Sequence, residues 1–249
     1  MIFYVAFDDT DTLDCGRGTG KLARWFADVI PSECNQKMVV RQQLLHSPDV
    51  PMTSHNSSLC CVIEAPDETY RETLIQRGIA HILNHFFEDS DPGFCVASED
   101  DDLSALIRFG IKCTGVKTTQ AEAKVAAKGV HLSGHGGTND GIIGAVAAVG
   151  LTHLGESGRI VDYADIRDLP QITTVGELRK RGIHLMSVNR HAEFIPDDHK
   201  IDNQNSLRPH LWARRLVVPV MASGNETWQT ISIKKEYTFV QQESVFTNN

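Results

Sequence analysis

The sequence contains no apolar run close to the roughly 20 residues that a helix needs to cross a bilayer. Its apolar opening, residues 1–7, has no basic segment before it and leads directly into acidic residues, which is not the pattern of a secretory signal peptide. None of the six cysteines stands in a CxxC pair, so the sequence predicts neither a cysteine-rich zinc site nor a secreted disulfide framework. We therefore expect a cytoplasmic protein with reduced cysteines and no membrane contact.

Positive charge is also scarce, with 24 lysines and arginines against 32 aspartates and glutamates and a formal net charge of −8. Proteins that bind nucleic acid unaided usually carry a basic face, because neutralising phosphates supplies much of the affinity. Only two short segments are basic, LRKRGIH (178–184) and WARR (212–215). Their pattern favours solvated charges on a helix and a strand edge over a groove for nucleic acid. The alternative of a local basic groove stays open.

Hydrophobic periodicity predicts an α/β first part and an α+β second part, with a boundary near residue 100 where SEDDDLS changes the composition. Strands are predicted at 2–9, 38–45, 57–65, 94–98, 158–166 and within 215–240. Helices are predicted at 18–30, 67–87, 104–111, 119–129, 142–151 and 174–183. The polar segment 194–210 is predicted to be a long loop, either a lid or partly disordered.

The densest chemistry lies in FDDTDTLDCGRGTGK, residues 7–21, at the predicted end of the first strand. Asp8, Asp9 and Asp11 stand so close together that they repel one another unless a cation lies between them. Mg²⁺ suits such oxygen ligands and bridges them to phosphates. The glycines that follow allow close backbone approach, and the next helix N-terminus favours an anion. The alternative is an acidic strand end that caps the helix without a ligand.

A Walker A loop is the first known chemistry to test against this stretch. Gly20 and Lys21 match the core of GxxxxGK[ST]. Cys15, however, stands where the first glycine belongs, and Leu22 replaces the hydroxyl residue that holds Mg²⁺. The sequence therefore argues against a Walker A loop.

An aspartyl-phosphate phosphatase is the second chemistry, because DTDTL (9–13) matches a strand that ends in DxDx[TV]. Asp9 would be the nucleophile and Asp11 the general acid. A further acidic pair would have to come from EDDD, residues 99–102. This alternative stays open, although it leaves the glycine-rich loop unexplained.

Four blocks together resemble a known family, the archaeal-type tRNA(Ile2) 2-agmatinylcytidine synthetases. FDDTDT…GRGTGKLA is similar to that family's IDDTDS…GMCTTYLA opening, and VRQQLLHSPDVPMTSHNSSL (40–59) to its RLVRLNPNxPWKTRGN segment. DSDPGFCV (89–96) resembles its NPG turn and strand, and GTNDGIIGAVAAVGL (137–151) its GRGLIGALAAIG. The blocks follow in the family's order over roughly residues 1–220.

The resemblance implies an ATP- and Mg²⁺-binding kinase-like domain over residues 1–100 and a ferredoxin-like domain with C-terminal strands over 101–249. It implies an ATP-dependent ligase or phosphotransferase that activates an acceptor oxygen by phosphoryl transfer, as in tRNA processing. Asp8, Asp9 and Asp11 would hold the metal, with Asp9, Asp11 and Thr19 catalytic. The cofactor residues would be Asp8, Thr10, Gly18, Gly20, Gly136, Gly137, Asn139 and Gly141, and the substrate residues Arg41, His55 and Asn56. Arg17 and Lys21 stand where the family has other residues, and we expect them to contact phosphate oxygens of the cofactor.

The departures from the family pattern concern the parts that hold tRNA. We expect the family's zinc ribbon and oligonucleotide-binding domain to be missing, and the segments SHNS (54–57) and TND (138–140) each lose an arginine. The acceptor is therefore expected to be either a tRNA bound through a partner protein or a small molecule. A non-catalytic nucleotide-binding subunit is the remaining alternative, and a homo-oligomer is compatible with all three.

Overall fold

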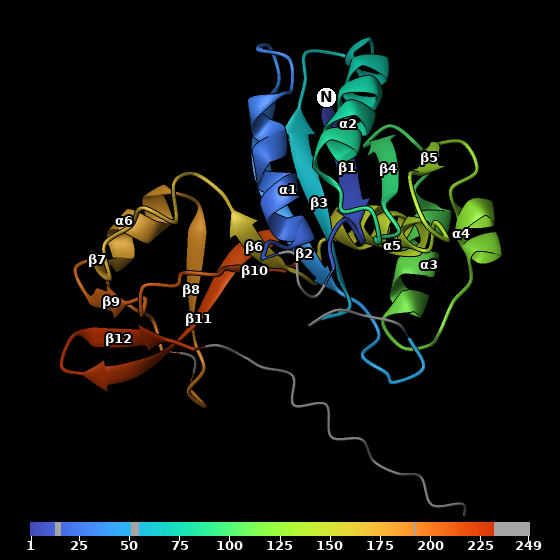
Figure 1. Cartoon of the computed structure of the whole chain (residues 1–249). Coiled ribbons are helices and arrows are strands. Elements are labelled where there is room, and N and C mark those ends of the chain that lie inside the picture. The colour runs from blue at the N-terminus through green and yellow to red at the C-terminus, as the bar shows by residue number, and fades with distance from the viewer. Residues whose placement is uncertain (13–15, 51–54, 192, 232–249) are drawn as a thin grey trace, which may run out of the picture.

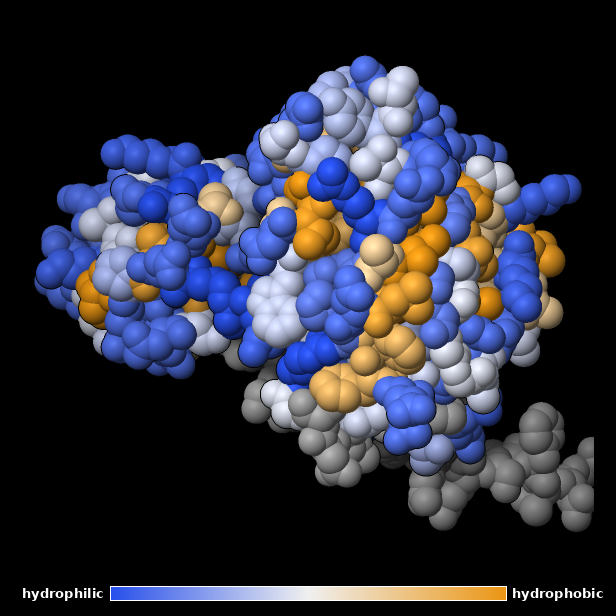
Figure 2. All heavy atoms as spheres, turned by 45° about the horizontal axis from the view of Figure 1, so that its top comes forward, coloured by the Kyte–Doolittle hydropathy of each residue, from blue (hydrophilic) through white to orange (hydrophobic). Residues whose placement is uncertain are grey.

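A computed structural model of the chain describes residues 1–12, 16–50, 55–191 and 193–231. Its strands form one 12-stranded, mostly antiparallel sheet in the order β5-β4-β1-β3-β2-β6-β10-β11-β12-β9-β7, with β8 paired to β11. The sheet runs through a larger lobe, which holds β1 to β5, and a smaller lobe, which holds β7 to β9, β11 and β12 (Figure 1). The space-filling view shows a mostly hydrophilic surface, with a hydrophobic stretch across the larger lobe (Figure 2).

β1 (Ile2–Asp8) is the central strand of the larger lobe and pairs antiparallel with β3 (Ser57–Glu64) on one side and β4 (Gly93–Ser98) on the other. β2 (Asn35–Gln43) and β5 (His131–Gly134) lie further out. Both faces of this sheet are covered, so its strands are apolar on both faces rather than alternating. The neighbours Cys60 and Cys61 illustrate this, because each is fully buried in a different hydrophobic cluster.

One face of the sheet is covered by α1 (Thr19–Trp25), which continues as the short 3₁₀ turn η1 (Phe26–Asp28), and by α2 (Tyr70–His85). Phe3, Val5 and Phe7 of β1 point into this layer, as their spacing of two requires. They pack with Leu22 of α1 and Leu74 of α2, both fully buried. This layer fixes the start of α1 next to the end of β1.

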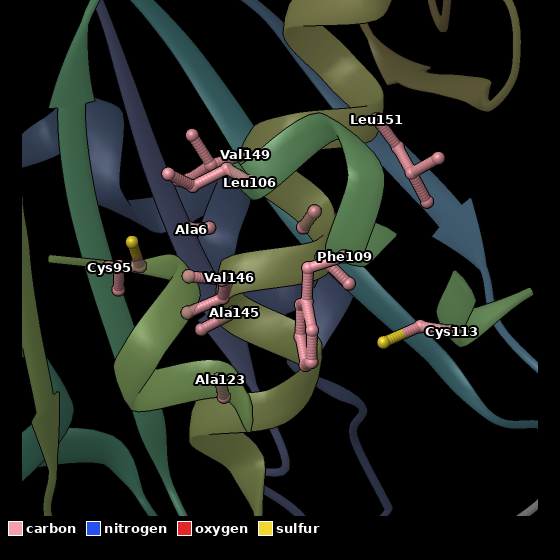
Figure 3. Close-up of a cluster of buried hydrophobic side chains, with 14 of the residues drawn as sticks. Ala6, Cys95, Leu106, Phe109, Cys113, Ala123, Ala145, Val146, Val149 and Leu151 are labelled. Atoms are coloured by element: carbon pink, nitrogen blue, oxygen red, sulfur yellow. The ribbon is translucent and has the colours of Figure 1, made fainter. Parts of the chain in front are cut away.

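The other face is covered by α5 (Gly141–Leu154), with α3 (Ser104–Cys113) and α4 (Gln120–Ala126) packed around it. Figure 3 shows this cluster, in which Ala145, Val146 and Val149 of α5 meet Ala6 of β1 and Cys95 of β4. α5 is rich in glycine and alanine, so its backbone lies close to the strands. Its N-terminus is thereby held against the ends of β1 and β4.

A third buried cluster, around Ile160, Leu178, Ile183, Ile201 and Val220, fills the smaller lobe and continues into the larger lobe through Val40 of β2 and Val62 of β3. In the smaller lobe the pairs β8–β11 and β9–β12 are parallel. β6 (Arg159–Asp162) and β10 (His210–Trp212) connect the two lobes in the sheet. The elements of the smaller lobe are β7 (Ile172–Thr174), α6 (Val175–Lys180), β8 (Ile183–Ser187), β9 (Lys200–Asp202), β11 (Arg215–Gly224) and β12 (Thr227–Thr230).

The predicted helices and strands are found near their expected places, and the mixed α/β class is confirmed. The long loop predicted over 194–210 is wrong, because this segment contains β9 and buries Ile195, Ile201 and Leu207. The boundary expected near residue 100 falls inside one hydrophobic cluster, which joins residues 95–97 to residues 103–151. The predicted strands beyond residue 231 lie outside the described residues. Within the described part, no helix is long and apolar enough to span a membrane.

Candidate active site

Asp8 is the last residue of β1 and lies opposite Gly93 of β4. Two glycines of α5 make room for it: a Cβ atom on Gly144 would lie 1.8 Å from Asp8 Oδ2, and one on Gly141 would lie 3.0 Å from the Asp8 carbonyl oxygen. Burial raises the pKa of Asp8 well above its usual range, and the nearby charges of Asp9 and Asp11 add to this. The surroundings of Asp8 therefore disfavour the ionised form of its carboxyl group.

Asp9 follows in a left-handed backbone conformation, with φ at 50°. This region is unfavourable for most residues that carry a side chain, although aspartate and asparagine tolerate it. The pKa of Asp9 rises to about 6, first because of burial and then because of the charges of Asp91, Asp11 and Asp140. Strained backbone and a perturbed acid together are typical of functional sites.

Asp11 fixes the start of α1 through Thr19. Asp11 Oδ1 accepts hydrogen bonds from the Thr19 backbone N at 2.9 Å and from Thr19 Oγ1 at 2.5 Å. Thr19 Oγ1 in turn accepts a hydrogen bond from Thr10 Oγ1 at 3.1 Å. Thr10 and Thr19 are both buried, so this network joins the end of β1 to α1 as one unit. The network holds Asp11 in place, and within it the Thr19 hydroxyl both donates and accepts a hydrogen bond.

Asp91 and Asp140 are the acidic residues of the site that the sequence analysis did not assign to it. Asp91 accepts a hydrogen bond from the Thr138 backbone N, and Asp140 Oδ1 accepts one from Gln120 Nε2 at 2.6 Å. Asp140 stands just before α5 but makes no side-chain cap bond. The only sequence signal for either residue was its place inside a family-like block.

A cavity of about 500 Å³ opens over these acids. Its acidic wall is made by Asp8, Asp9, Asp11, Asp91 and Asp140. Its apolar wall is made by Leu44, Leu45, Val50, Cys113, Val116 and Ile143. A pocket of this size with one apolar wall and a few converging polar groups is the usual form of a small-molecule site.

Arg17 and Lys21, predicted to contact the cofactor, do not line this cavity. The Arg17 guanidinium lies 4.6 Å from the centre of the Phe87 ring and 5.5 Å from that of Trp25. Lys21 Nζ lies 5.0 Å from the centre of the Trp25 ring. Both cations therefore pack on aromatic faces. This cation–π packing explains a cation at positions 17 and 21 without a phosphate ligand.

The predicted glycines of the first loop differ in what the structure requires of them. Gly18 precedes α1, and a Cβ atom there would lie 3.6 Å from Asp11 Oδ2. A Cβ atom on Gly20 would come no closer than 3.9 Å to Leu59. Both distances are ordinary van der Waals contacts, so neither position requires glycine for space.

The second glycine-rich segment brings only part of its predicted residues to the cavity. Gly141 lines it, whereas Gly136, Gly137 and Asn139 do not. Gly137 has φ at +51°, and a Cβ atom there would lie 2.0 Å from Asp91 Oδ1. This glycine therefore allows the loop to wrap the Asp91 carboxylate.

Two of the three predicted substrate residues, His55 and Asn56, line the cavity. Burial, followed by the charge of Arg41, lowers the pKa of His55. Asn56 Nδ2 donates a hydrogen bond to the Leu45 carbonyl oxygen at 2.8 Å. Arg41 lies outside the lining and donates from Nε to Ser57 Oγ at 2.8 Å.

Within the described residues, no three His, Cys, Asp or Glu side chains converge closely enough to hold a metal ion by themselves. Mg²⁺ does not require such a cage, because it commonly takes one or two carboxylates and completes its shell with water and phosphate oxygens. Buried neighbouring carboxylates with raised pKa values fit a cation that arrives with a phosphate ligand.

The acidic run 99–102, needed for the phosphatase alternative, lies at the far end of β1. Glu99 Oε1 accepts a hydrogen bond from the backbone N of Ile2, the first residue of that strand, and Asp101 pairs with Arg71. Because a strand rises about 3.3 Å per residue, this end is roughly 20 Å from Asp8. The run does not contribute to the site.

No family model matches the sequence, and no curated protein matches it. Solved structures of similar fold include the following three. One is TiaS, a tRNA(Ile2) agmatidine synthetase, in complex with tRNA(Ile2), AMPCPP and agmatine. It is 21% identical over 72% of this chain and 44% of that chain, with a TM-score of 0.52. The complex of TiaS with tRNA(Ile2) and ATP (TM-score 0.52) and a tRNA fluorescent labeling enzyme (0.51) are each 24% identical over 60% of this chain and 36% of theirs.

The chain thus spans less than half the length of these structures. At this identity the similarity shows a shared fold. The resemblance read from the four sequence blocks is confirmed to that extent, as a distant and partial likeness.

Proposed function

We propose that the chain is an ATP- and Mg²⁺-dependent enzyme that activates an acceptor oxygen by phosphoryl transfer. The observation that carries this proposal is the set of half-buried aspartates at the end of β1, which line a cavity large enough for a small molecule. The solved structures of similar fold include complexes with ATP and with AMPCPP, which supports a nucleotide as the ligand.

Each part of the cavity has a role in this proposal. Asp8, Asp9 and Asp11 hold the magnesium ion, whose chemistry is to neutralise charge on the phosphate oxygens. The apolar wall takes the base of the nucleotide. Thr19 lies at the edge of the triphosphate, and its hydrogen bond to Asp11 orients its hydroxyl.

The acceptor is a tRNA or a small molecule with a carbonyl or hydroxyl oxygen. His55 and Asn56 stand on the cavity wall, where an acceptor entering from that side would meet them. The complexes of TiaS with tRNA(Ile2) support a tRNA acceptor. The cluster of half-buried carboxylates is also suited to a cationic second substrate.

Calorimetric titration of ATP with and without Mg²⁺ tests the proposal. Asp9→Asn removes one charge, and asparagine accepts the same left-handed backbone, so the loop keeps its shape. Asp165→Asn is the matched control, because Asp165 is exposed in the smaller lobe and also has a positive φ, at 56°.

We expect ATP to bind in a Mg²⁺-dependent manner. Asp9→Asn should weaken this binding by at least about tenfold, which is about 1.4 kcal/mol of binding free energy. Asp165→Asn should leave it unchanged. Equal binding by all three proteins would overturn the proposal, as would the absence of ATP binding. Release of inorganic phosphate or ADP on addition of a candidate acceptor then separates an enzyme from a non-catalytic subunit.

A further inference from the structure

Away from the acidic cavity, arginines from separate segments meet where the two lobes join. Arg41 of β2 is the direct cross-strand partner of Arg159 of β6, and Arg159 is likewise the partner of His210 of β10. Directly opposed residues of antiparallel strands have their side chains on the same face of the sheet. The register therefore places two guanidinium groups and an imidazole in one row across three strands.

Three more segments bring positive charge to this row. Burial, followed by the charges of Arg167 and Arg24, lowers the pKa of Arg208, while Asp162 acts in the opposite direction. Arg24 belongs to α1, and Arg167 and Arg208 belong to two loops of the smaller lobe. We call the five residues Arg24, Arg41, Arg159, Arg167 and Arg208 the arginine cluster.

A second cavity, of about 160 Å³, is lined by two members of the arginine cluster. Arg159, Arg208 and the buried His210 line it, together with polar residues of the loop 203–206. Its volume is about five times the roughly 30 Å³ that a water molecule occupies in the liquid. The surface where the lobes meet is largely hydrophilic on the face shown in Figure 2.

Ion pairs within the described part of the chain do not balance the charges of four of the five cluster arginines. Arg24, Arg41, Arg167 and Arg208 form no ion pair there, whereas Arg71, Arg179 and Arg181 each bind a carboxylate. Four of the five cluster arginines are half-buried. Like charges withdrawn from water destabilise a protein unless an opposite charge joins them, so the arrangement fits an anion from outside.

We propose that the arginine cluster is a binding site for phosphate groups, carried either by the backbone of an RNA strand or by a small phosphate ester. The planar guanidinium forms paired hydrogen bonds with phosphate oxygens, which makes arginine the residue best suited to this ligand. Burial and the charge of Arg159 lower the pKa of Arg41, while the charge of Asp11 acts in the opposite direction. The row thus leads from the second cavity toward the acidic site.

The site is independent of ATP binding, so its test excludes divalent cations. Fluorescence anisotropy of a labelled tRNA transcript, in EDTA and over a series of salt concentrations, is measured for the wild type and for the triple variant Arg24→Gln, Arg159→Gln, Arg208→Gln. Titration with inorganic pyrophosphate forms the second arm. Arg108→Gln on α3 is the matched control, because this exposed arginine lies outside the cluster. Circular dichroism checks that each variant folds.

If RNA supplies the phosphates, the triple variant binds the transcript at least about tenfold more weakly at low salt. The slope of log affinity against log salt also falls by roughly 2 to 3, at 0.7 to 0.9 for each contact. If a small ester supplies them, pyrophosphate binds and the triple variant loses it, while RNA does not bind. Should the triple variant fail to fold, the single variants are each expected to lower the slope by about 0.7 to 0.9. The proposal is overturned if neither probe binds the wild type, or if the cluster variants bind both probes as well as Arg108→Gln does.

Discussion

Gly144 of α5 lies so close to Asp8 that a Cβ atom at position 144 would be 1.8 Å from Asp8 Oδ2 and 3.2 Å from Asp8 Cβ. Alanine normally stabilises a helix relative to glycine. We expect the opposite here: Gly144→Ala lowers the free energy of unfolding by about 1–3 kcal/mol, because the buried carboxylate has to move. Urea denaturation measures this change.

The double variant Asp8→Ala, Gly144→Ala isolates that contact. With the carboxylate gone, the nearest atom of residue 8 lies 3.2 Å away, and a small shift accommodates it. The cost of Gly144→Ala is therefore expected to fall by more than about 1 kcal/mol in the Asp8→Ala background. Costs that simply add would show that the two residues do not meet as described.

Thr19 offers a test of the network beneath the site. Thr19→Val keeps the shape but leaves Asp11 without the hydroxyl that donates to it, and Thr10 without its acceptor. We expect a loss of about 1–3 kcal/mol in thermal or chemical unfolding, while Thr19→Ser loses clearly less. A valine variant as stable as the wild type would mean that the network contributes nothing.

Lys21 distinguishes a packing cation from a phosphate ligand. Its Nζ lies over the Trp25 ring and outside the cavity lining. We therefore expect Lys21→Met, which keeps the apolar stem, to bind ATP with Mg²⁺ within about twofold of the wild type. A loss of tenfold or more, about 1.4 kcal/mol, would instead assign Lys21 to the triphosphate.

His210 gives the protein a pH dependence with a definite sign. Burial, followed by the charge of Arg159, lowers its pKa to about 4 from the ordinary 6.5. Between these values the unfolded chain binds a proton that the folded protein does not, so stability falls as the pH falls. We expect a loss on the order of 2 kcal/mol from this group between pH 6.5 and 4.

His210→Leu removes the titrating group and keeps an apolar side chain of similar size. Urea unfolding at several pH values should show a shallower decline for this variant than for the wild type between pH 6.5 and 4. Parallel curves would mean that His210 accepts its proton as readily in the folded protein as in the unfolded one.

The sequence predicts the first three acids of the site because they are neighbours in the chain. Asp8, Asp9 and Asp11 follow one apolar strand, and the end of that strand can be read from its pattern. Asp91 and Asp140 reach the same place only because β4 pairs with β1 and α5 packs across both. Such pairing is not visible in a local pattern.

The arginine cluster is even less visible in the sequence than Asp91 and Asp140 are as members of the acidic site. The segments that look basic in the sequence, 178–184 and 212–215, are largely neutralised or packed: Arg181 binds Glu177, and Arg214 packs against Gly155. The cluster itself is drawn from single arginines scattered between residues 24 and 208. The register of β2 and β6 brings Arg41 and Arg159 together, and α1 and two loops of the smaller lobe add the other three.

The elements of the fold likewise divide into those that the sequence predicts and those that it does not. Helices with a long periodic face, such as α2, and buried strands, such as β1 and β3, are predicted close to their observed bounds. Short strands of three residues, such as β7 and β9, carry too little pattern to be recognised. The composition change near residue 100 coincides with a surface turn before α3, and one hydrophobic cluster contains residues from both sides of it. The division into two domains there stays a prediction.

The most direct test of the central claim is a crystal of the protein soaked with a non-hydrolysable ATP analogue and Mn²⁺. Anomalous scattering then locates the metal independently of the nucleotide. The account predicts a manganese peak near 2.0–2.2 Å from a carboxylate oxygen of Asp8, Asp9 or Asp11, with the triphosphate on its other side. A nucleotide bound elsewhere, with no metal at these three side chains, would contradict it.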